Sequence, residues 1–146
     1  MRRSSIITSI LLFSLFTLAC SQKEKLTDNS GTMIRSDPDQ DNLIVIGQLN
    51  LDFSKFKVTF IELGADRCLP CRAMQPIMRE IAKEFKGQVQ VVFYDVWKDP
   101  RPARIYGIQL IPTQVFIDQK GEEFFRHVGF FPKEEILKVL RQKGVQ

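Results

Sequence analysis

The chain has 146 residues, of which 44% are hydrophobic and 26% charged, and its net charge is +4. This length and balance predict one globular domain with a single core, and they exclude a wholly disordered chain, a collagen-like fibre and a polytopic membrane protein. Lys and Arg alternate with Asp and Glu along most of the sequence, whereas nucleic-acid binders concentrate cations on one face, so we expect no nucleic-acid partner.

Residues 1–19 have the pattern of a signal peptide. A short basic start is followed by the apolar run Ile6–Ala19, which is shorter than the roughly 20 residues that a membrane-spanning helix needs. The run ends in Thr17-Leu18-Ala19-Cys20, which resembles the lipobox of bacterial lipoproteins, although Thr17 stands where leucine is usual. The resemblance implies cleavage before Cys20 and a diacylglycerol on its thiol. An ordinary signal peptide, or a membrane anchor that happens to contain a cysteine, is the alternative.

Residues 20–42 form the second segment, a lipidated N-terminus followed by a flexible tether. The segment is rich in Lys, Asp, Ser and Gln and has no aromatic residue, so it cannot bury enough apolar surface to offset its ordering entropy. A random coil of this length spans about 26 Å. With a lipid on Cys20, the protein would be anchored to the extracytoplasmic side of a bacterial membrane.

Residues 43–146 form the predicted folded domain. Apolar residues at three- and four-residue spacing between Met74 and Phe85 predict a helix that ends near Gly87. The other predicted elements are strands at Leu43–Ile46, Val58–Leu63 and Val89–Val96, a short helix at Pro102–Tyr106, a hairpin of Thr113–Ile117 with Glu123–Val128, and a last helix opened by Pro132. This order predicts an α/β domain with a mixed sheet and helices on its faces.

Cys68-Leu69-Pro70-Cys71 directly follows a predicted strand and opens the first helix. A closed zinc site needs four ligands, but the domain otherwise offers only His127, and haem attachment needs a histidine where Arg72 stands. We therefore expect no metal and no cofactor. A structural disulfide across so short a loop would stabilise the fold little, which leaves a redox-active dithiol as the favoured interpretation.

The helix start suits redox chemistry because its unpaired N–H groups favour a thiolate. Arg67 and Arg72 favour the same state, and Asp66 opposes it. Cys68 precedes the helix and is predicted to be the exposed nucleophile, which forms a mixed disulfide with a partner. Cys71, one turn further on, is predicted to be shielded and to resolve that mixed disulfide.

From about Leu43 to the C-terminus the sequence resembles the thioredoxin family. Besides the two cysteines, the resemblance is carried by Pro70, Pro76, Gly107, Gly129 and the segment Ile111-Pro112-Thr113. It implies a thioredoxin-like fold, with helices on both faces of a mixed central sheet, and thiol–disulfide oxidoreductase activity.

The resemblance also implies roles for residues around the cysteines. Pro112 is expected to be cis and to lie beside the sulfurs, leaving Ile111 to pair with an extended substrate, with Leu69 and Pro70 as further substrate contacts. Alternatively, Pro112 simply begins a strand. Glu62 takes the place of the family's buried aspartate, which helps to move the resolving cysteine's proton; the alternative is an ordinary surface charge at a strand end.

Several positions depart from the family's pattern. Arg67 replaces the usual tryptophan, Leu69 replaces a glycine, and Phe93 stands where a lysine usually pairs with the buried carboxylate. Glu62 is one methylene longer than aspartate. Substrate choice and redox potential therefore cannot be transferred from the family.

Other conspicuous side chains are interpreted as structural. Met74 and Met78 are expected in the core, and His127 on a half-exposed strand. Phe93, Tyr94 and Trp97 are expected to serve core and edge packing, with a partner groove as the alternative for Trp97.

The leading functional hypothesis is a membrane-tethered, extracytoplasmic thiol–disulfide oxidoreductase. The resemblance suggests a reductant of protein disulfides, recharged by a membrane thiol transporter and serving proteins such as apocytochromes. A disulfide-forming oxidant and a non-enzymatic binding module are the alternatives.

Overall fold

The computed structural model describes residues 44–146 of the chain. The predicted signal peptide, the lipid on Cys20 and the tether lie outside these residues and stay predictions. Among the described residues, no helix combines the length and the apolar character needed to cross a membrane.

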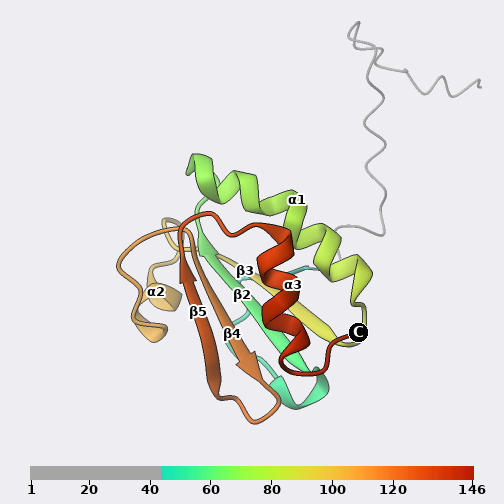
Figure 1. The fold of residues 1–146 in the computed structure, drawn as a ribbon. Helices are drawn as coiled ribbons and strands as arrows, with labels where there is room; N and C mark the ends of the chain where they lie inside the picture. The colour runs from blue at the N-terminus through green and yellow to red at the C-terminus, as the bar shows by residue number, and fades with distance from the viewer. Residues whose placement is uncertain (1–43) are drawn as a thin grey trace, which may run out of the picture. The chain divides into compact units, whose positions relative to one another are not determined.

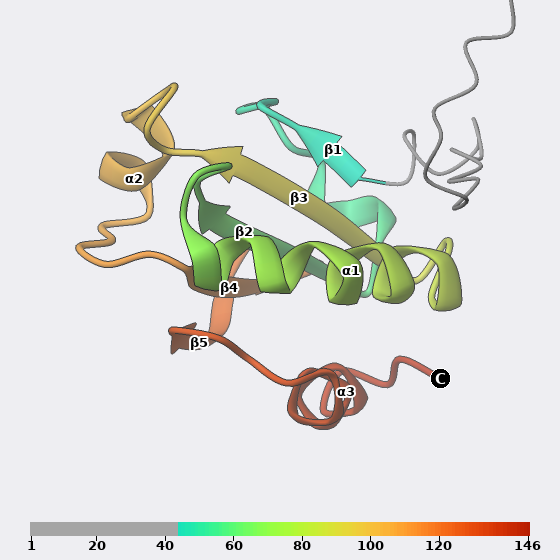
Figure 2. The ribbon, with the colours of Figure 1, turned by 90° about the horizontal axis from the view of Figure 1, so that it is seen from above.

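A five-stranded mixed sheet forms the centre of the domain, and Figure 2 shows its strands in the order β1, β3, β2, β4, β5. β2 pairs in parallel with β3 and antiparallel with β4, so it is the middle strand. The elements are β1 (Ile44–Ile46), η1 (Phe53–Lys55), β2 (Val58–Gly64), α1 (Leu69–Glu84), β3 (Val89–Asp95), α2 (Arg101–Ile105), β4 (Thr113–Asp118), β5 (Glu123–Val128) and α3 (Lys133–Arg141).

Two apolar clusters cover the two faces of the sheet. α1 and α3 pack on one face, and Figure 1 shows them in front of the strands. On this face Val58 and Phe60 of β2 contact the buried side chains of both helices. On the other face, Ile61 and Leu63 pack with Val92, Tyr94 and the segment that follows α2. Because β2 is covered on both faces, all seven of its residues are buried.

The predicted order of elements and the α/β class with helices on both faces are confirmed. Boundaries differ by one to three residues, and α1 ends at Glu84 rather than near Gly87. β2 continues to Gly64, β3 ends at Asp95, and α3 begins at Lys133 with Pro132 as its cap. η1 was not predicted; Asp52 starts it by accepting a hydrogen bond from the N–H of Ser54.

Most of the predicted packing is also observed. Met74 and Met78 are fully buried, and Phe93 and Tyr94 are buried with only a small exposed fraction. His127 is half-buried. Trp97 is the exception, because its side chain is 62% exposed. It lies in the turn after β3, where Asp95 holds the backbone through the N–H groups of Trp97 and Lys98, and this turn directs the indole outward.

Candidate active site

Cys68 and Cys71 form a disulfide at the N-terminus of α1, with their Cα atoms 5.2 Å apart. Cys68 is the residue that caps the helix, and its Sγ accepts a hydrogen bond from the N–H of Cys71 at 3.4 Å. Pro70 fits the first turn because it has no N–H to leave unpaired. The sequence between the cysteines thus begins the helix and places both sulfurs at its positive end.

The two cysteines differ in accessibility. Cys71 is 1% exposed and Cys68 is 9% exposed. Cys68 is the more accessible of the two, in the predicted order, but it is buried rather than openly exposed. Ala65 and Ile111 pack around the two sulfur-bearing side chains. A partner must therefore bring its disulfide close against this surface to reach Cys68.

The segment before β4 lies beside the disulfide. The Ile111–Pro112 peptide bond is cis, as expected, and Pro112 is buried. The carbonyl of Pro112 accepts a hydrogen bond from the N–H of Gly129 at 2.8 Å, and Thr113 Oγ1 donates to the carbonyl of Leu110 at 2.7 Å. These bonds hold the loop before β4 and the loop after β5 together next to Ile111.

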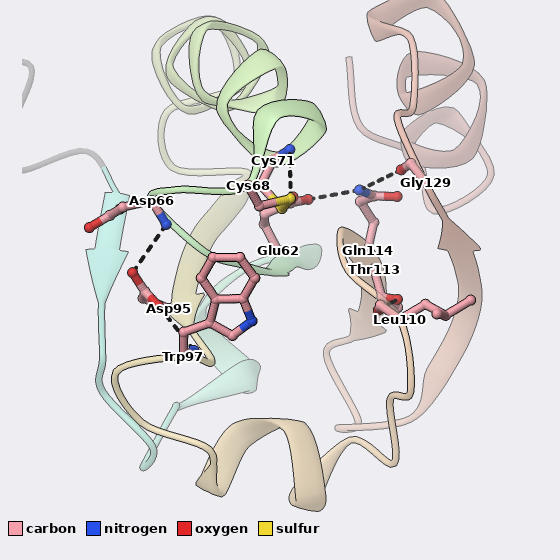
Figure 3. Close-up of a disulfide and its surroundings, with 10 residues drawn as sticks. All are labelled: Glu62, Asp66, Cys68, Cys71, Asp95, Trp97, Leu110, Thr113, Gln114 and Gly129. Atoms are coloured by element: carbon pink, nitrogen blue, oxygen red, sulfur yellow. Dashed lines mark hydrogen bonds between the residues drawn. A yellow bond between two sulfur atoms is a disulfide. The ribbon is translucent and has the colours of Figure 1, made fainter.

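Glu62 is fully buried on β2, so the alternative of a surface charge is wrong. Alternate residues of β2 share a face, which places Glu62 between Phe60 and Gly64, toward α1. Gly64 in turn lies directly against the side chain of Cys71. The carboxyl group therefore points into the same layer as the disulfide, as Figure 3 shows.

Burial shifts the ionisation of this carboxyl group. Loss of hydration raises the pKa of Glu62 to about 8, and a hydrogen bond from Gln114 opposes the rise. No cation is paired with Glu62 among the described residues; its neighbour on β3 is Phe93. A carboxyl group with a pKa near neutrality can accept and release a proton at physiological pH.

Gln114 is the site residue that the sequence analysis missed. It lies directly opposite Glu62 on β4 and is fully buried. Its Nε2 donates to Glu62 Oε2 at 2.9 Å and to the carbonyl of Gly129 at 3.1 Å. An amide within the otherwise apolar run of a buried strand was the available signal, since buried polar side chains need partners.

Exposed apolar side chains border the disulfide. A shallow pocket is lined by Leu69, Pro70, Arg72, Ala73 and Phe130, and Leu69 and Phe130 are exposed. A second pocket is lined by Asp66, Arg67, Asp95, Trp97 and Lys98. The surface that a partner would meet is thus partly apolar, with charged side chains of both signs at its margins.

His127, whose side chain could in principle take part in catalysis or metal binding, is engaged in other contacts. The His127 ring stacks on Phe131 with centroids 4.1 Å apart, and its Nε2 lies 3.2 Å from the carbonyl of Phe130. Within residues 44–146, no three side chains of His, Cys, Asp or Glu gather as metal ligands.

Comparison with known proteins relates this arrangement to one family. Residues 50–142 match the family model described as thioredoxin. Thioredoxin of Staphylococcus aureus is 31% identical over 83 residues, which cover 57% of this chain and 79% of that protein. A mutant thioredoxin from Halobacterium salinarum superposes with a TM-score of 0.61 at 26% identity, covering 70% of this chain and 89% of the other. Chloroplastic thioredoxin z gives a TM-score of 0.61 at 27% identity, with 70% and 94% covered.

Proposed function

This chain belongs to the thioredoxin family and is a thiol–disulfide oxidoreductase that acts on protein thiols and disulfides, and on that premise we propose that it is a membrane-tethered, extracytoplasmic reductant of protein disulfides. The observation that supports the redox chemistry in this proposal is the Cys68–Cys71 pair at the start of α1, with a buried carboxyl group on the strand behind it.

The reaction begins from the reduced pair. The Cys68 thiolate, favoured by the helix N-terminus, attacks one sulfur of a partner disulfide. The partner's S–S bond breaks, a mixed disulfide with Cys68 forms, and the released partner sulfur takes up a proton. Cys71 then gives its proton to Glu62 and attacks Cys68 Sγ. This step breaks the mixed disulfide, forms the Cys68–Cys71 disulfide and releases the second partner sulfur as a thiolate, which takes up a proton as Glu62 gives one back to the solvent. Two electrons thus pass to the partner.

Partner binding uses the surface around the disulfide. Ile111 offers its backbone to an extended segment of the partner, as a strand added at an edge. Leu69 and Pro70 supply apolar contact on one side, and they share their pocket with Phe130. Because Cys68 is so little exposed, these contacts bring the partner's disulfide within reach before chemistry begins.

The direction and the location are supported by sequence features. Ile111 precedes Pro112 as in reducing thioredoxins, which favours a reductant over an oxidant. Cys20, at the end of the apolar run, favours a lipid anchor on the outer side of a bacterial membrane. Since the periplasm is kept oxidising, the pair needs a dedicated electron donor, and a membrane thiol transporter fits that need. Apocytochromes, whose cysteines must be reduced, are the proposed substrates.

The reduction potential of the Cys68–Cys71 pair tests the direction. Equilibration with a glutathione or dithiothreitol series is expected to give a value near about −270 mV or lower, whereas a value near about −120 mV would identify an oxidant. The cysteine roles are tested separately. Cys68→Ser should abolish reduction of protein disulfides, and Cys71→Ala should accumulate a mixed disulfide with the partner. Unchanged activity in Cys68→Ser would contradict a redox function and favour a binding module.

The anchor is tested by metabolic labelling with a radioactive fatty acid. The wild-type chain and the Cys68→Ser/Cys71→Ser double variant should both be labelled and sediment with membranes. Cys20→Ser should lose the label and be released from the membrane. A labelled Cys20→Ser chain, or an unlabelled wild type, would contradict the proposed lipid on this residue.

A further inference from the structure

One continuous set of hydrogen bonds links the buried carboxyl group to the loops beside the disulfide. Gln114 Nε2 donates to Glu62 Oε2 at 2.9 Å and to the carbonyl of Gly129 at 3.1 Å. The N–H of Gly129 donates to the carbonyl of Pro112 at 2.8 Å. Figure 3 shows Gln114 between Glu62 and Gly129, with its Nε2 donating to both. A single amide therefore connects β2 to the segment that carries the cis proline.

The two hydrogen bonds fix how the amide is oriented. Both hydrogens of Nε2 are used, so the nitrogen rather than the oxygen faces the carboxyl group. A donor in this place favours the ionised carboxylate, which only accepts hydrogen bonds. Glu62 Oε1 and Gln114 Oε1 are buried without a hydrogen-bond partner in the described part of the protein. Glu62 Oε2 is thus held by a hydrogen bond, whereas Glu62 Oε1 remains available to accept one.

We infer that Gln114 is a positioning residue: its amide anchors Glu62 through Oε2, stabilises the carboxylate and leaves Oε1 free to accept the proton of Cys71. The inference rests on the proposed role of Glu62 as proton acceptor. Gln114 donates its two hydrogen bonds to Glu62 and Gly129 and none to the sulfur of Cys68 or Cys71. It therefore acts through Glu62.

The neighbours of Glu62 explain why this one donor matters. On β3 the adjacent residue is Phe93, which gives no hydrogen bond and no charge. α1 contributes Cys68 and Cys71 near the site, and α3 buries only apolar Ile136, Val139 and Leu140 toward this layer.

Two further titratable groups lie on elements that pack around Glu62. His127 follows Gln114 in the same row across the sheet, but its ring is stacked on Phe131. Asp95 lies at the end of β3 and is engaged by the backbone N–H groups of Asp66 and Trp97. Neither His127 nor Asp95 is hydrogen-bonded to Glu62. Within residues 44–146, Gln114 is therefore the one residue that donates a hydrogen bond to this carboxyl group.

Gln114 stabilises the carboxylate of Glu62 as a neutral donor, without adding a charge to the buried site. Burial raises the pKa of Glu62 to about 8, and the hydrogen bond from the side-chain amide of Gln114 opposes that rise. A paired lysine or arginine would favour the ionised carboxylate by its charge as well, and would lower the pKa of Glu62 further. With Gln114 alone, the carboxyl group stays near the pH at which it can both accept and return a proton.

The test is the substitution Gln114→Met in the full chain, because methionine keeps the length of the side chain and removes both donors. The titration of Glu62 is followed directly by ¹³C NMR of labelled glutamate carboxyls, with Glu62→Gln to assign the signal. The midpoint is expected to rise by about one to two pH units, as for loss of one hydrogen bond to a charged group. Gln90→Met is the matched control, since Gln90 bonds Thr59 in the same sheet, and it should leave the midpoint unchanged.

A second readout separates this inference from the proposed function. The rate at which Cys71 resolves a mixed disulfide is measured against pH, and its inflection should move with the carboxyl midpoint in Gln114→Met. An unmoved carboxyl midpoint would overturn the role of Gln114 alone. A moved midpoint with an unmoved rate profile would overturn Glu62 as the proton acceptor, and with it the positioning role.

A measurement on the wild-type chain keeps the inference testable if the variant does not fold. The ¹⁵N and ¹H signals of the Gln114 side-chain amide should titrate with the same midpoint as the Glu62 carboxyl and lose that titration in Glu62→Gln. Amide signals that do not respond to the carboxyl group would overturn the inference.

Discussion

Gly64 lies against the side chain of Cys71 so closely that a Cβ at position 64 would stand 3.1 Å from Cys71 Cβ and 3.3 Å from its Sγ. The same Cβ would stand 3.3 Å from Cε2 of Phe93. Both neighbours are buried, so neither can move away freely. The end of β2 thus leaves no space for a side chain behind the resolving sulfur.

Gly64→Ala should therefore destabilise the oxidised protein by about 1–3 kcal/mol, as overpacking does in a closed core. In the reduced protein Cys71 Sγ is no longer tied to Cys68 and can turn away, so the reduced form should lose less. The reduction potential is then expected to rise by about 30 mV for each 1.4 kcal/mol of difference, measured by equilibration with glutathione. Gly47→Ala is the control, because the φ of 71° at Gly47 also favours glycine, but a Cβ there would meet no atom within 4 Å. It should lower stability without changing the potential. Equal losses in both redox forms of Gly64→Ala would contradict the prediction.

Glu62 should make stability depend on pH. Its pKa of about 8 in the folded protein lies above the ordinary value of 4.5, so between these limits the folded state holds a proton that the unfolded state has released. The stabilising contribution is complete below 4.5 and is lost as the pH rises through about 8, at up to about 1.4 kcal/mol per pH unit. Glu62→Gln removes this dependence. Urea unfolding of both oxidised proteins from pH 5 to 9 should show the free energy of unfolding of Glu62→Gln increasing relative to that of the wild type as the pH rises. A difference that stays constant across this range would argue against a buried, protonated Glu62.

Phe130 should contribute to recognition of protein partners and little to folding. Its ring is half-exposed and shares a pocket with Leu69 and Pro70 at the start of α1. Phe130→Ala should lower kcat/KM for a protein disulfide about tenfold, which corresponds to about 1.4 kcal/mol of lost apolar contact. Reduction of oxidised glutathione should stay within about twofold, because that substrate is too small to cover the pocket.

Ile105→Ala, which changes an exposed residue of α2 outside both pockets, serves as the control for Phe130→Ala. A similar loss with both substrates would show that Phe130 supports the site rather than the partner.

Asp95 should stabilise the approach to the disulfide. Its carboxylate accepts hydrogen bonds from the N–H groups of Asp66, Trp97 and Lys98, each at 3.1 Å, and so ties the loop before Cys68 to the turn after β3. Burial opposes ionisation, but these bonds prevail and lower the pKa of Asp95 below 3.8. Asp95→Asn should lower the free energy of unfolding by about 1–3 kcal/mol at pH 7.

The pH dependence of that difference provides the check. Because the pKa of Asp95 is lowered in the folded protein, its contribution is present above pH 3.8 and is lost as the pH falls through the folded value. The gap between wild type and Asp95→Asn should shrink accordingly in urea unfolding at low pH. Glu122→Gln, which changes an exposed carboxylate outside this turn, is the control and should alter the free energy of unfolding little. A gap that does not depend on pH would indicate that the aspartate acts only through its shape.

Much of the fold could be predicted because local pattern and tertiary environment agree. The almost continuous apolar run of β3 corresponds to a strand covered on both faces, and the spacing from Met74 to Phe85 corresponds to the buried face of α1. Trp97 was assigned to packing because aromatic side chains are usually buried, but the turn held by Asp95 points it outward. Hydrogen bonds that shape a turn leave no periodic signal in the sequence.

The site could be predicted in part. Cys68, Cys71 and Pro112 stand in a recognisable order along the chain, and the structure brings them together. Gln114 was overlooked because its significance depends on register: only the pairing of β2 with β4 sets it opposite Glu62. Pairing between strands 52 residues apart is decided by the whole sheet, and sequence spacing alone does not reveal it.

The contact between Glu62 and Gln114 has an evolutionary consequence. An aspartate at position 62 would be one methylene shorter and would draw the carboxyl group back from the amide, leaving Gln114 a buried donor without an acceptor on that side. Selection should then replace the glutamine, and an apolar residue at position 114 should leave a glutamate at 62 equally unsupported. The two positions are therefore expected to change together among relatives of this protein, as a covarying pair rather than as two independent sites.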